Sequence, residues 1–167
     1  MNKKIIISIA VIISLFLIGG LVFNYFYQKK IENIEDEAKN NATKTVEEVF
    51  TYSGSENYLD NLEQLKGLLS EEVYKERTSK QSTEQIKKLE EEYGYRVVVV
   101  VNDAKLRQQI NNLYIYEVTA TESTFYDKVA GSEEYSLVLN YEIEIQYVDN
   151  QYQVTKILRL DDAGDEE

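Results

Sequence analysis

Carboxylates are the side chains of this sequence that come closest to catalytic chemistry. Cysteine and histidine are both absent, which excludes thiol nucleophiles, the usual zinc and iron–sulfur sites, and the side chain that titrates near neutral pH. Glu142 and Glu144 lie two residues apart and could form an acid–base pair on one strand face. They alternate with apolar residues, which indicates a solvated face, whereas tuning a carboxyl pKa requires burial. We therefore predict no catalytic residue and no enzyme activity.

The remaining charges argue against metals, cofactors and nucleic acids. Asp161, Asp162 and Asp165 could be considered as calcium ligands, but they lack the loop spacing and glycine placement of a known calcium site. Residues 161–167 are instead predicted to be a disordered acidic tail. The formal net charge is −12, and a surplus of negative charge opposes binding to phosphate backbones. We predict no metal, cofactor or nucleic-acid partner.

An apolar segment near the N-terminus has the length of a membrane span. Residues 5–23 contain no charged side chain, and as a helix they would cover about 28 Å, which matches the hydrocarbon core. The aromatic residues 25–27 follow, where rings favour the headgroup region. We predict a cytoplasmic tail at 1–4 and an uncleaved signal-anchor helix at 5–27. A cleaved signal peptide is the alternative, although the sequence has no convincing small-x-small cleavage site.

Three helical segments are predicted between the membrane span and residue 94. Apolar residues recur at three- and four-residue steps over 31–50, which predicts an amphipathic helix. This helix is expected either to extend the membrane helix outward or to pair with a copy of itself as a stalk. Gly54 breaks this helix, and a second apolar face runs over 58–74. Ser82 and Gly94 predict the N-cap and C-cap of the third helix. Ser70 is a candidate cap for a separate short turn within the second segment.

Four strands are predicted after residue 94, because the apolar period changes to two. Two of them are about fifteen residues long, so the sheet must bend strongly around the helices to stay compact. The prediction is an α+β domain over 28–160, with helices packed on a curved four-stranded antiparallel sheet. The strands are expected at Tyr95–Asn102, Asn112–Tyr126, Glu134–Val148 and Gln151–Leu160, with Gly131 and Asp149–Asn150 at the turns.

Fourteen tyrosines could serve either the core or an interface. In the third strand one face is predicted to be core, and it carries Tyr135, Leu137, Leu139, Tyr141, Ile143, Ile145 and Tyr147. Three other tyrosines, at 114, 116 and 152, are not assigned to either role from the sequence.

The order of these elements resembles the cystatin-like roll of the nuclear-transport-factor-two superfamily. The stretch Val46–Glu76, VEEVFTYSGSENYLDNLEQLKGLLSEEVYKE, looks like the helix, break and helix that open such domains in membrane-anchored proteins of low-GC Gram-positive bacteria. In plan the chain is similar to the eighth VirB component of type IV secretion and conjugation systems. No functional residue of that family can be transferred by position.

The resemblance implies a scaffold of a conjugation or secretion apparatus in the bacterial cytoplasmic membrane, with the N-terminus inside and the domain outside. Its partners would be the bilayer, through residues 5–27, and other membrane proteins or a second copy of the chain. The alternative function is an extracytoplasmic ligand-binding module. That alternative predicts a cavity lined by the concave face of the sheet.

Overall fold

The computed structural model describes residues 3–129 and 134–160, with side chains described for 18–30, 32–129 and 134–160. The chain divides into two compact units, Met1–Glu37 and Ala38–Glu167. The predicted turn at Gly131 and the acidic tail at 161–167, with its three aspartates, lie outside the described residues.

Helix α1 spans Lys3–Phe50 without a break, so it includes both the predicted membrane span and the amphipathic segment that follows it. Within the part of the chain that the structure describes, no helix is long and apolar enough to cross a membrane. Most of the predicted span, residues 5–17, lies outside the residues with described side chains. The anchor therefore remains a prediction.

Three shorter helices follow in the second unit: α2 (Ser55–Leu65), α3 (Glu71–Arg77) and α4 (Lys80–Tyr93). The side chain of Ser70 accepts a hydrogen bond from Val73 N, so the predicted separate turn is α3. Gly94 has φ of 62° at the end of α4, which confirms the predicted left-handed C-cap. The predicted N-cap of α4 at Ser82 is wrong, because Ser79 occupies that position and accepts from Ser82 N.

The four strands form one antiparallel sheet in the order β1-β2-β3-β4. The hairpin from β3 to β4 turns at Asp149 and Asn150, which have φ of 51° and 63°, as their predicted role requires. The first strand is longer than predicted, because two bulges interrupt its alternation without ending its pairing with β2. The strands span Tyr95–Ile110, Leu113–Tyr126, Glu134–Val148 and Gln151–Arg159.

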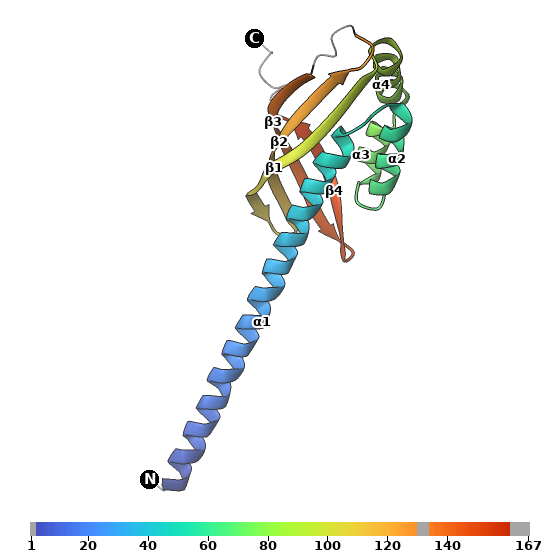
Figure 1. The fold of residues 1–167 in the computed structure, drawn as a ribbon. Coiled ribbons are helices and arrows are strands. Elements are labelled where there is room, and N and C mark those ends of the chain that lie inside the picture. Colours follow the sequence, from blue (N-terminus) through green and yellow to red (C-terminus); the bar gives the residue numbers. More distant parts are fainter. Residues whose placement is uncertain (1–2, 130–133, 161–167) are drawn as a thin grey trace, which may run out of the picture. The chain divides into compact units, whose positions relative to one another are not determined.

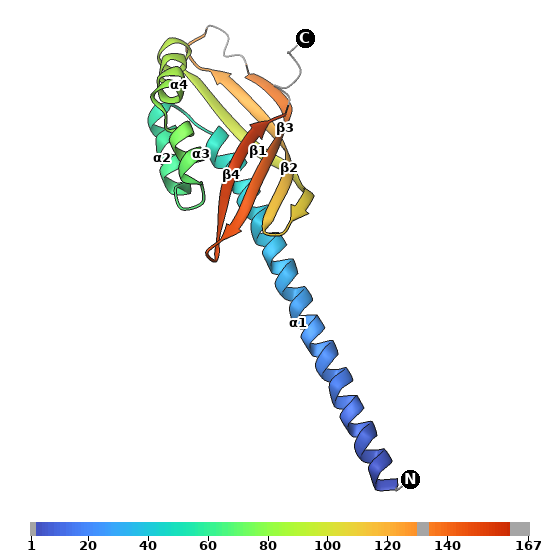
Figure 2. The same ribbon diagram turned by 180° about the vertical axis from the view of Figure 1, so that it is seen from behind.

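The sheet curls around the last turns of α1. Figures 1 and 2 show β1 and β2 on one side of the end of α1 and β4 on the other, with α2, α3 and α4 completing the helical layer. Between them lie fully buried side chains of β3, which confirms the predicted core face over its second half. The buried face of α1 consists of Ala38, Ala42, Val46 and Val49.

Two residues of the predicted core face of β3 are exposed. The side chains of Tyr135 and Leu137 are 52% and 58% exposed. Both residues are an even number of positions from buried Tyr141 on the same strand, so they point to the same inner face. This end of β3 lies beyond its pairing with β4 and beyond the elements that cover the rest of the inner face. Alternation in a sequence predicts which face a residue points to and does not predict whether that face is covered.

Helix α2 begins at a tight contact with α4. Gly54 precedes the helix with φ of 141°, and a Cβ added there would lie 2.4 Å from Glu90 Oε1. Glu90 Oε2 accepts hydrogen bonds from Ser55 N at 2.9 Å and from Ser55 Oγ at 3.2 Å. A carboxylate from another helix thus caps α2, because Gly54 has no side chain to do so.

We expect Glu90→Ala to lower the free energy of unfolding by about 1 kcal/mol, the usual effect of removing a helix cap. Glu91→Ala is the matched control, since the side chain of Glu91 forms an exposed ion pair with Lys87 at 3.8 Å and should contribute less than about 0.5 kcal/mol. Urea unfolding of the full chain in detergent, followed by circular dichroism, measures both. Equal effects of the two substitutions would contradict a capping role for Glu90.

Candidate interaction surface

The edge of β1 is covered by residues at and just after the end of α1. Tyr52 exchanges two backbone hydrogen bonds with Val97, at 2.9 and 2.8 Å. Thr51 Oγ1 accepts from Val99 N at 2.9 Å and donates to Val99 O at 3.4 Å. Glu47 Oε1 accepts from Val101 N at 3.2 Å. The edge-facing backbone groups of Val97 and Val99 and the N–H of Val101 are therefore paired.

The rest of the β1 edge and the edge of β4 are protected in other ways. Beyond Val101 the first strand contains two bulges and the charged residues Lys105 and Arg107, features that discourage pairing with another strand. Val154 of β4 donates to Leu68 O at 2.8 Å and accepts from Ser70 N at 2.9 Å. Arg77 Nη2 donates to Ile157 O, also on β4, at 3.2 Å.

The segment Glu134–Leu139 of β3, termed here the open β3 segment, has no such protection among the described residues. β4 pairs with β3 only over Tyr141–Val148, and one further bond joins Leu160 N to Asn140 O at 2.8 Å. The pairing of β3 with β2 continues without a bulge to Glu134. Residues 135–139 carry no charge. An uncharged, regular strand edge of this kind is a template for pairing with another strand.

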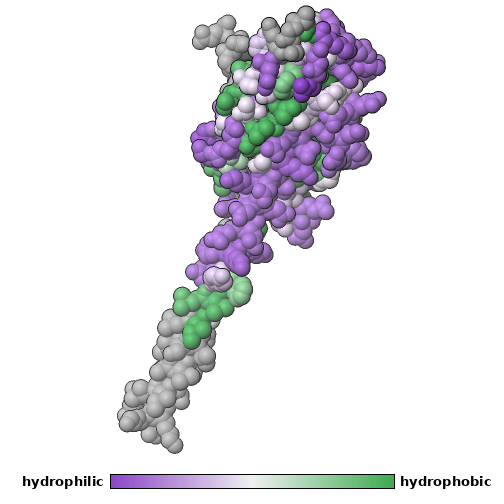
Figure 3. Space-filling model, in the orientation of Figure 1, coloured by the Kyte–Doolittle hydropathy of each residue, from purple (hydrophilic) through white to green (hydrophobic). Residues whose placement is uncertain are grey.

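Both faces of the sheet are apolar and exposed around this segment. Tyr135 and Leu137 are exposed on the inner face, and Val138 is 63% exposed on the outer face. In register with Val138, through Thr121 of β2, lies Val100 of β1, which is 55% exposed. Figure 3 shows a hydrophobic stripe over this part of the sheet, between hydrophilic surfaces. Such a patch on an acidic domain is typical of a protein-binding surface.

A chain of tyrosine rings connects the open β3 segment with the helical layer. The ring centroids are 5.6 Å apart for Tyr58 and Tyr52, 6.0 Å for Tyr52 and Tyr95, 5.4 Å for Tyr95 and Tyr126, and 6.2 Å for Tyr126 and Tyr135. Burial raises the pKa of the Tyr52 phenol well above its usual range, and the neighbouring Tyr95 and the Glu122 carboxylate add to the rise. Only the last ring, Tyr135, is mostly exposed.

The three tyrosines that the sequence left unassigned belong to the core. Tyr114, Tyr116 and Tyr152 are no more than 6% exposed. Tyr114 and Tyr152 pack edge to face with their centroids 6.5 Å apart. An interface role among the tyrosines described here is therefore best supported at Tyr135.

A pocket of about 290 Å³ opens between the helices and the start of β1. Its polar groups include the guanidinium of Arg77, whose Nε is buried without a hydrogen-bond partner in the described part of the chain. The aromatic walls include Phe50, Tyr52 and Tyr95. A small anion with an aromatic or aliphatic body would match this chemistry.

This pocket differs from the cavity that the ligand-binding alternative predicts. Tyr95 is the one residue of the sheet in its lining. The middle of the inner face is filled by side chains that are at most 2% exposed, namely Tyr116, Val118, Tyr141, Ile143 and Ile145. The sheet therefore forms the core of the domain rather than the wall of a cavity at this place.

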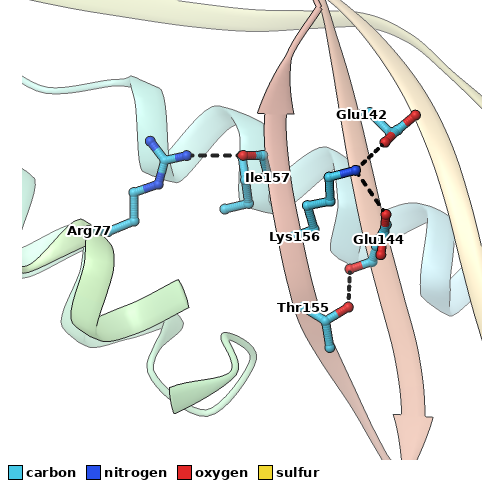
Figure 4. Close-up of polar contacts among 6 residues, drawn as sticks. All are labelled: Arg77, Glu142, Glu144, Thr155, Lys156 and Ile157. Atoms are coloured by element: carbon cyan, nitrogen blue, oxygen red, sulfur yellow. Dashed lines mark hydrogen bonds and ion pairs between the residues drawn. The ribbon is translucent and has the colours of Figure 1, made fainter. Parts of the chain in front are cut away.

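The two glutamates considered for acid–base chemistry are paired ions on the outer face. Lys156 Nζ lies 2.9 Å from Glu142 Oε1 and 3.1 Å from Glu144 Oε1 (Figure 4). Hydrogen bonds to these two carboxylates raise the pKa of Lys156. The side chains of Glu142 and Glu144 are 32% and 24% exposed, so both carboxylates are partly open to solvent and are not enclosed in a cavity.

Solved structures of secretion and conjugation proteins resemble this domain. CagV, a VirB8 homologue of a type IV secretion system from Helicobacter pylori, has a TM-score of 0.56 at 14% identity, covering 73% of this chain and 95% of that chain. The putative transfer protein TraH from the Gram-positive conjugative plasmid pIP501 has a TM-score of 0.52 at 17% identity, covering 75% and 92%. An NTF2-like protein involved in plasmid conjugation has a TM-score of 0.51 at 12% identity, covering 75% of this chain and 48% of that chain.

The fold is that of VirB8-type domains. The predicted resemblance to the eighth VirB component is thus confirmed for the fold of the domain. No protein-family model matches the sequence, and no curated protein matches it. At identities of 12–17% the likeness to these proteins lies in the fold, with little sequence pattern in common.

Sequence reasoning did not find the open β3 segment, although one signal was present. The predicted fourth strand ends at residue 160, and pairing through the turn at 149–150 carries it only to the middle of the longer third strand. A comparison of the two strand lengths would have indicated an unpaired end in the VirB8-type sheet.

The raised pKa of Tyr52 predicts a loss of stability in alkali. A free tyrosine ionises near pH 10, so the unfolded chain ionises Tyr52 before the folded domain does. Neutral Tyr52 therefore makes its full contribution to the free energy of unfolding below pH 10, and this contribution is lost as the pH rises above 10. We expect the free energy of unfolding to fall less between pH 8 and pH 11 in Tyr52→Phe than in the wild type.

Urea unfolding at the two pH values measures this difference. Tyr147→Phe is the control, because Tyr147 lies at the other end of the sheet against Tyr152. Its free energy of unfolding should fall between the two pH values by the same slope as in the wild type. A slope for Tyr52→Phe equal to that of the wild type would show that Tyr52 ionises at an ordinary pKa.

Proposed function

We propose that this chain is a membrane-anchored assembly subunit of a bacterial conjugation or type IV secretion apparatus, and that it acts through protein contacts without catalysing a reaction. The observation that carries this proposal is the VirB8-type fold, which the chain has in common with proteins of such systems. The apolar, uncharged segment at 5–23 supports an anchor that precedes the domain.

The surface chemistry supports a role in binding proteins. The open β3 segment offers a strand edge with apolar side chains on both faces, while Glu142 and Glu144 are paired with Lys156. An acidic surface with a local apolar patch favours a protein partner over a polyanion. In this proposal the N-terminus lies in the cytoplasm and residues 28–160 lie outside the membrane.

Deletion of the gene from a donor strain should reduce conjugative transfer to background, because an assembly subunit is needed to build the apparatus. Complementation with the wild type should restore transfer. The double variant Glu142→Gln and Glu144→Gln should restore it to within a few-fold, since it removes the carboxylates and keeps the fold. Transfer is counted as transconjugants per donor.

Normal transfer in the deletion strain would exclude the proposed role. Failure of the double variant to complement, with the protein present at the wild-type level, would point to chemistry at these carboxylates instead of assembly.

The anchor has a separate test. Wild-type protein should remain in the membrane pellet after alkaline carbonate extraction. The double substitution Ile12→Asp and Leu15→Asp should release it, because each aspartate near the centre of a span opposes insertion by roughly 3 kcal/mol. Asn40→Asp adds the same charge outside the predicted span and should leave the protein in the pellet. Complete extraction of the wild type would contradict a membrane anchor.

A further inference from the structure

The backbone groups of the open β3 segment that point away from β2 can be assigned from two hydrogen bonds. Asn140 O accepts from Leu160 N on the β4 side, whereas Tyr147 N donates to Asn112 O on the β2 side. Because β3 pairs with β2 without a bulge, even-numbered residues direct their N–H and C=O groups to the β4 side. Beyond the end of β4, these are the groups of Glu134, Ser136 and Val138.

These three residues are arranged symmetrically about Ser136. An antiparallel copy of the same segment, related by a two-fold axis at Ser136, would pair Ser136 with its equivalent and Glu134 with Val138 in both directions. This register uses every open backbone group of the segment, whereas an axis at Leu137 would place Glu134 against Asn140, whose carbonyl already binds Leu160. Self-complementarity of this kind is the requirement for an isologous dimer.

The side chains fit the same register. Tyr135 of one copy would face Leu137 of the other on the inner face, where both are now more than half exposed. Aromatic and aliphatic residues in cross-strand pairs stabilise antiparallel sheets. Glu134 would face Val138, so no two acidic side chains are opposite each other, although the chain has a net charge of −12. The uncharged residues 135–139 keep repulsion at the seam low.

We propose that the occupant of the open β3 segment is a second copy of this chain, joined by antiparallel pairing of the two β3 strands into a continuous eight-stranded sheet. This inference goes beyond the proposed function and does not depend on it. The other described edges are covered, bulged or charged, so the seam forms at one place. A seam of three paired residues per copy is small compared with a stable interface of about 1,600 Å², so the dimer is reversible and depends on concentration.

Ser136→Cys gives a direct test, because the chain has no other cysteine. Across the axis the two Cα atoms would lie about 5.5 Å apart, within disulfide range. Ser123→Cys is the matched control. Ser123 is the register partner of Ser136 on β2, and their hydroxyls are 2.8 Å apart. In the dimer the Cα atoms of the two Ser123 residues would be about 10 Å farther apart than those of the two Ser136 residues, because one more strand spacing lies between each Ser123 and the seam.

With mild oxidation of the full-length protein in detergent, Ser136→Cys should form covalent dimers and Ser123→Cys should not. Equal crosslinking of the two variants, or none, would overturn the proposal. A disulfide-linked product of Ser136→Cys with a different protein, formed in the producing cell, would also overturn it and identify another occupant.

Ser136→Lys tests the seam without a covalent bond. It would place two lysines opposite each other, and dimerisation measured by sedimentation should weaken by about fivefold or more. Ser123→Lys removes the same serine pair and adds the same charge to the same face, so it should leave dimerisation within twofold of the wild type. Equal weakening by both variants would contradict a seam at β3.

Hydrogen exchange of the wild type resolves whether the segment is open in the monomer. The amides of Ser136 and Val138 should exchange rapidly in dilute protein and become protected as concentration rises. Strong protection of both amides at every concentration would mean that the chain covers its own edge, and the proposal would be wrong. None of these outcomes bears on the transfer experiment, which tests the proposed function separately.

Discussion

The domain depends on the closure of a long sheet around the end of one helix. Strands of 14 to 16 residues are far longer than a flat sheet of four strands can keep compact, because twist accumulates along them. The helix at the centre has alanine at positions 38 and 42, both fully buried. Small side chains allow the strands to approach the helix on both sides, and the bulges in β1 provide the bending.

The same closure determines what fills the interior of the domain. Its interior is occupied by large apolar and aromatic side chains, of which Tyr116 and Tyr141 are the largest fully buried ones. Glu63 and Glu71 on the helices, and Glu142 and Glu144 on the outer face, form ion pairs with lysine. Glu122 points to the inner face, where it accepts a hydrogen bond from the Tyr141 hydroxyl at 3.3 Å and lies 3.9 Å from Arg159 Nη1. The features that support the proposed role therefore lie on the surface and the edges of the domain, where residue pattern carries less information than in a catalytic site.

The sequence predicted the elements that have a local physical cause. Gly94 and Ser70 act at helix ends through their own backbone or side chain, and Asp149 and Asn150 adopt the positive φ that a tight hairpin needs. The third strand was predicted with its correct bounds, since strict alternation over fifteen residues has few other interpretations.

The failures came from interactions that sequence order does not encode. The cap of α2 comes from Glu90, 35 residues away. The first strand continues past Asn102 because its bulges disturb the period of two while β2 still pairs with it. Tyr135 and Leu137 point to the inner face as predicted, but their exposure depends on where β4 ends. The surface that matters most for the proposed role was therefore the part least accessible to pattern reasoning.

The attachment of β1 to the end of α1 has a mechanical meaning. Glu47, Thr51 and Tyr52 connect the helix terminus to three alternate residues of β1 through five hydrogen bonds. A pull transmitted along the last turns of α1 would reach the sheet first at this side, where the load is divided among several bonds. The load would reach the opposite side of the sheet less directly, through β2, through the packing of Phe50 on Tyr141, and through the bonds between β4 and the segment after α2.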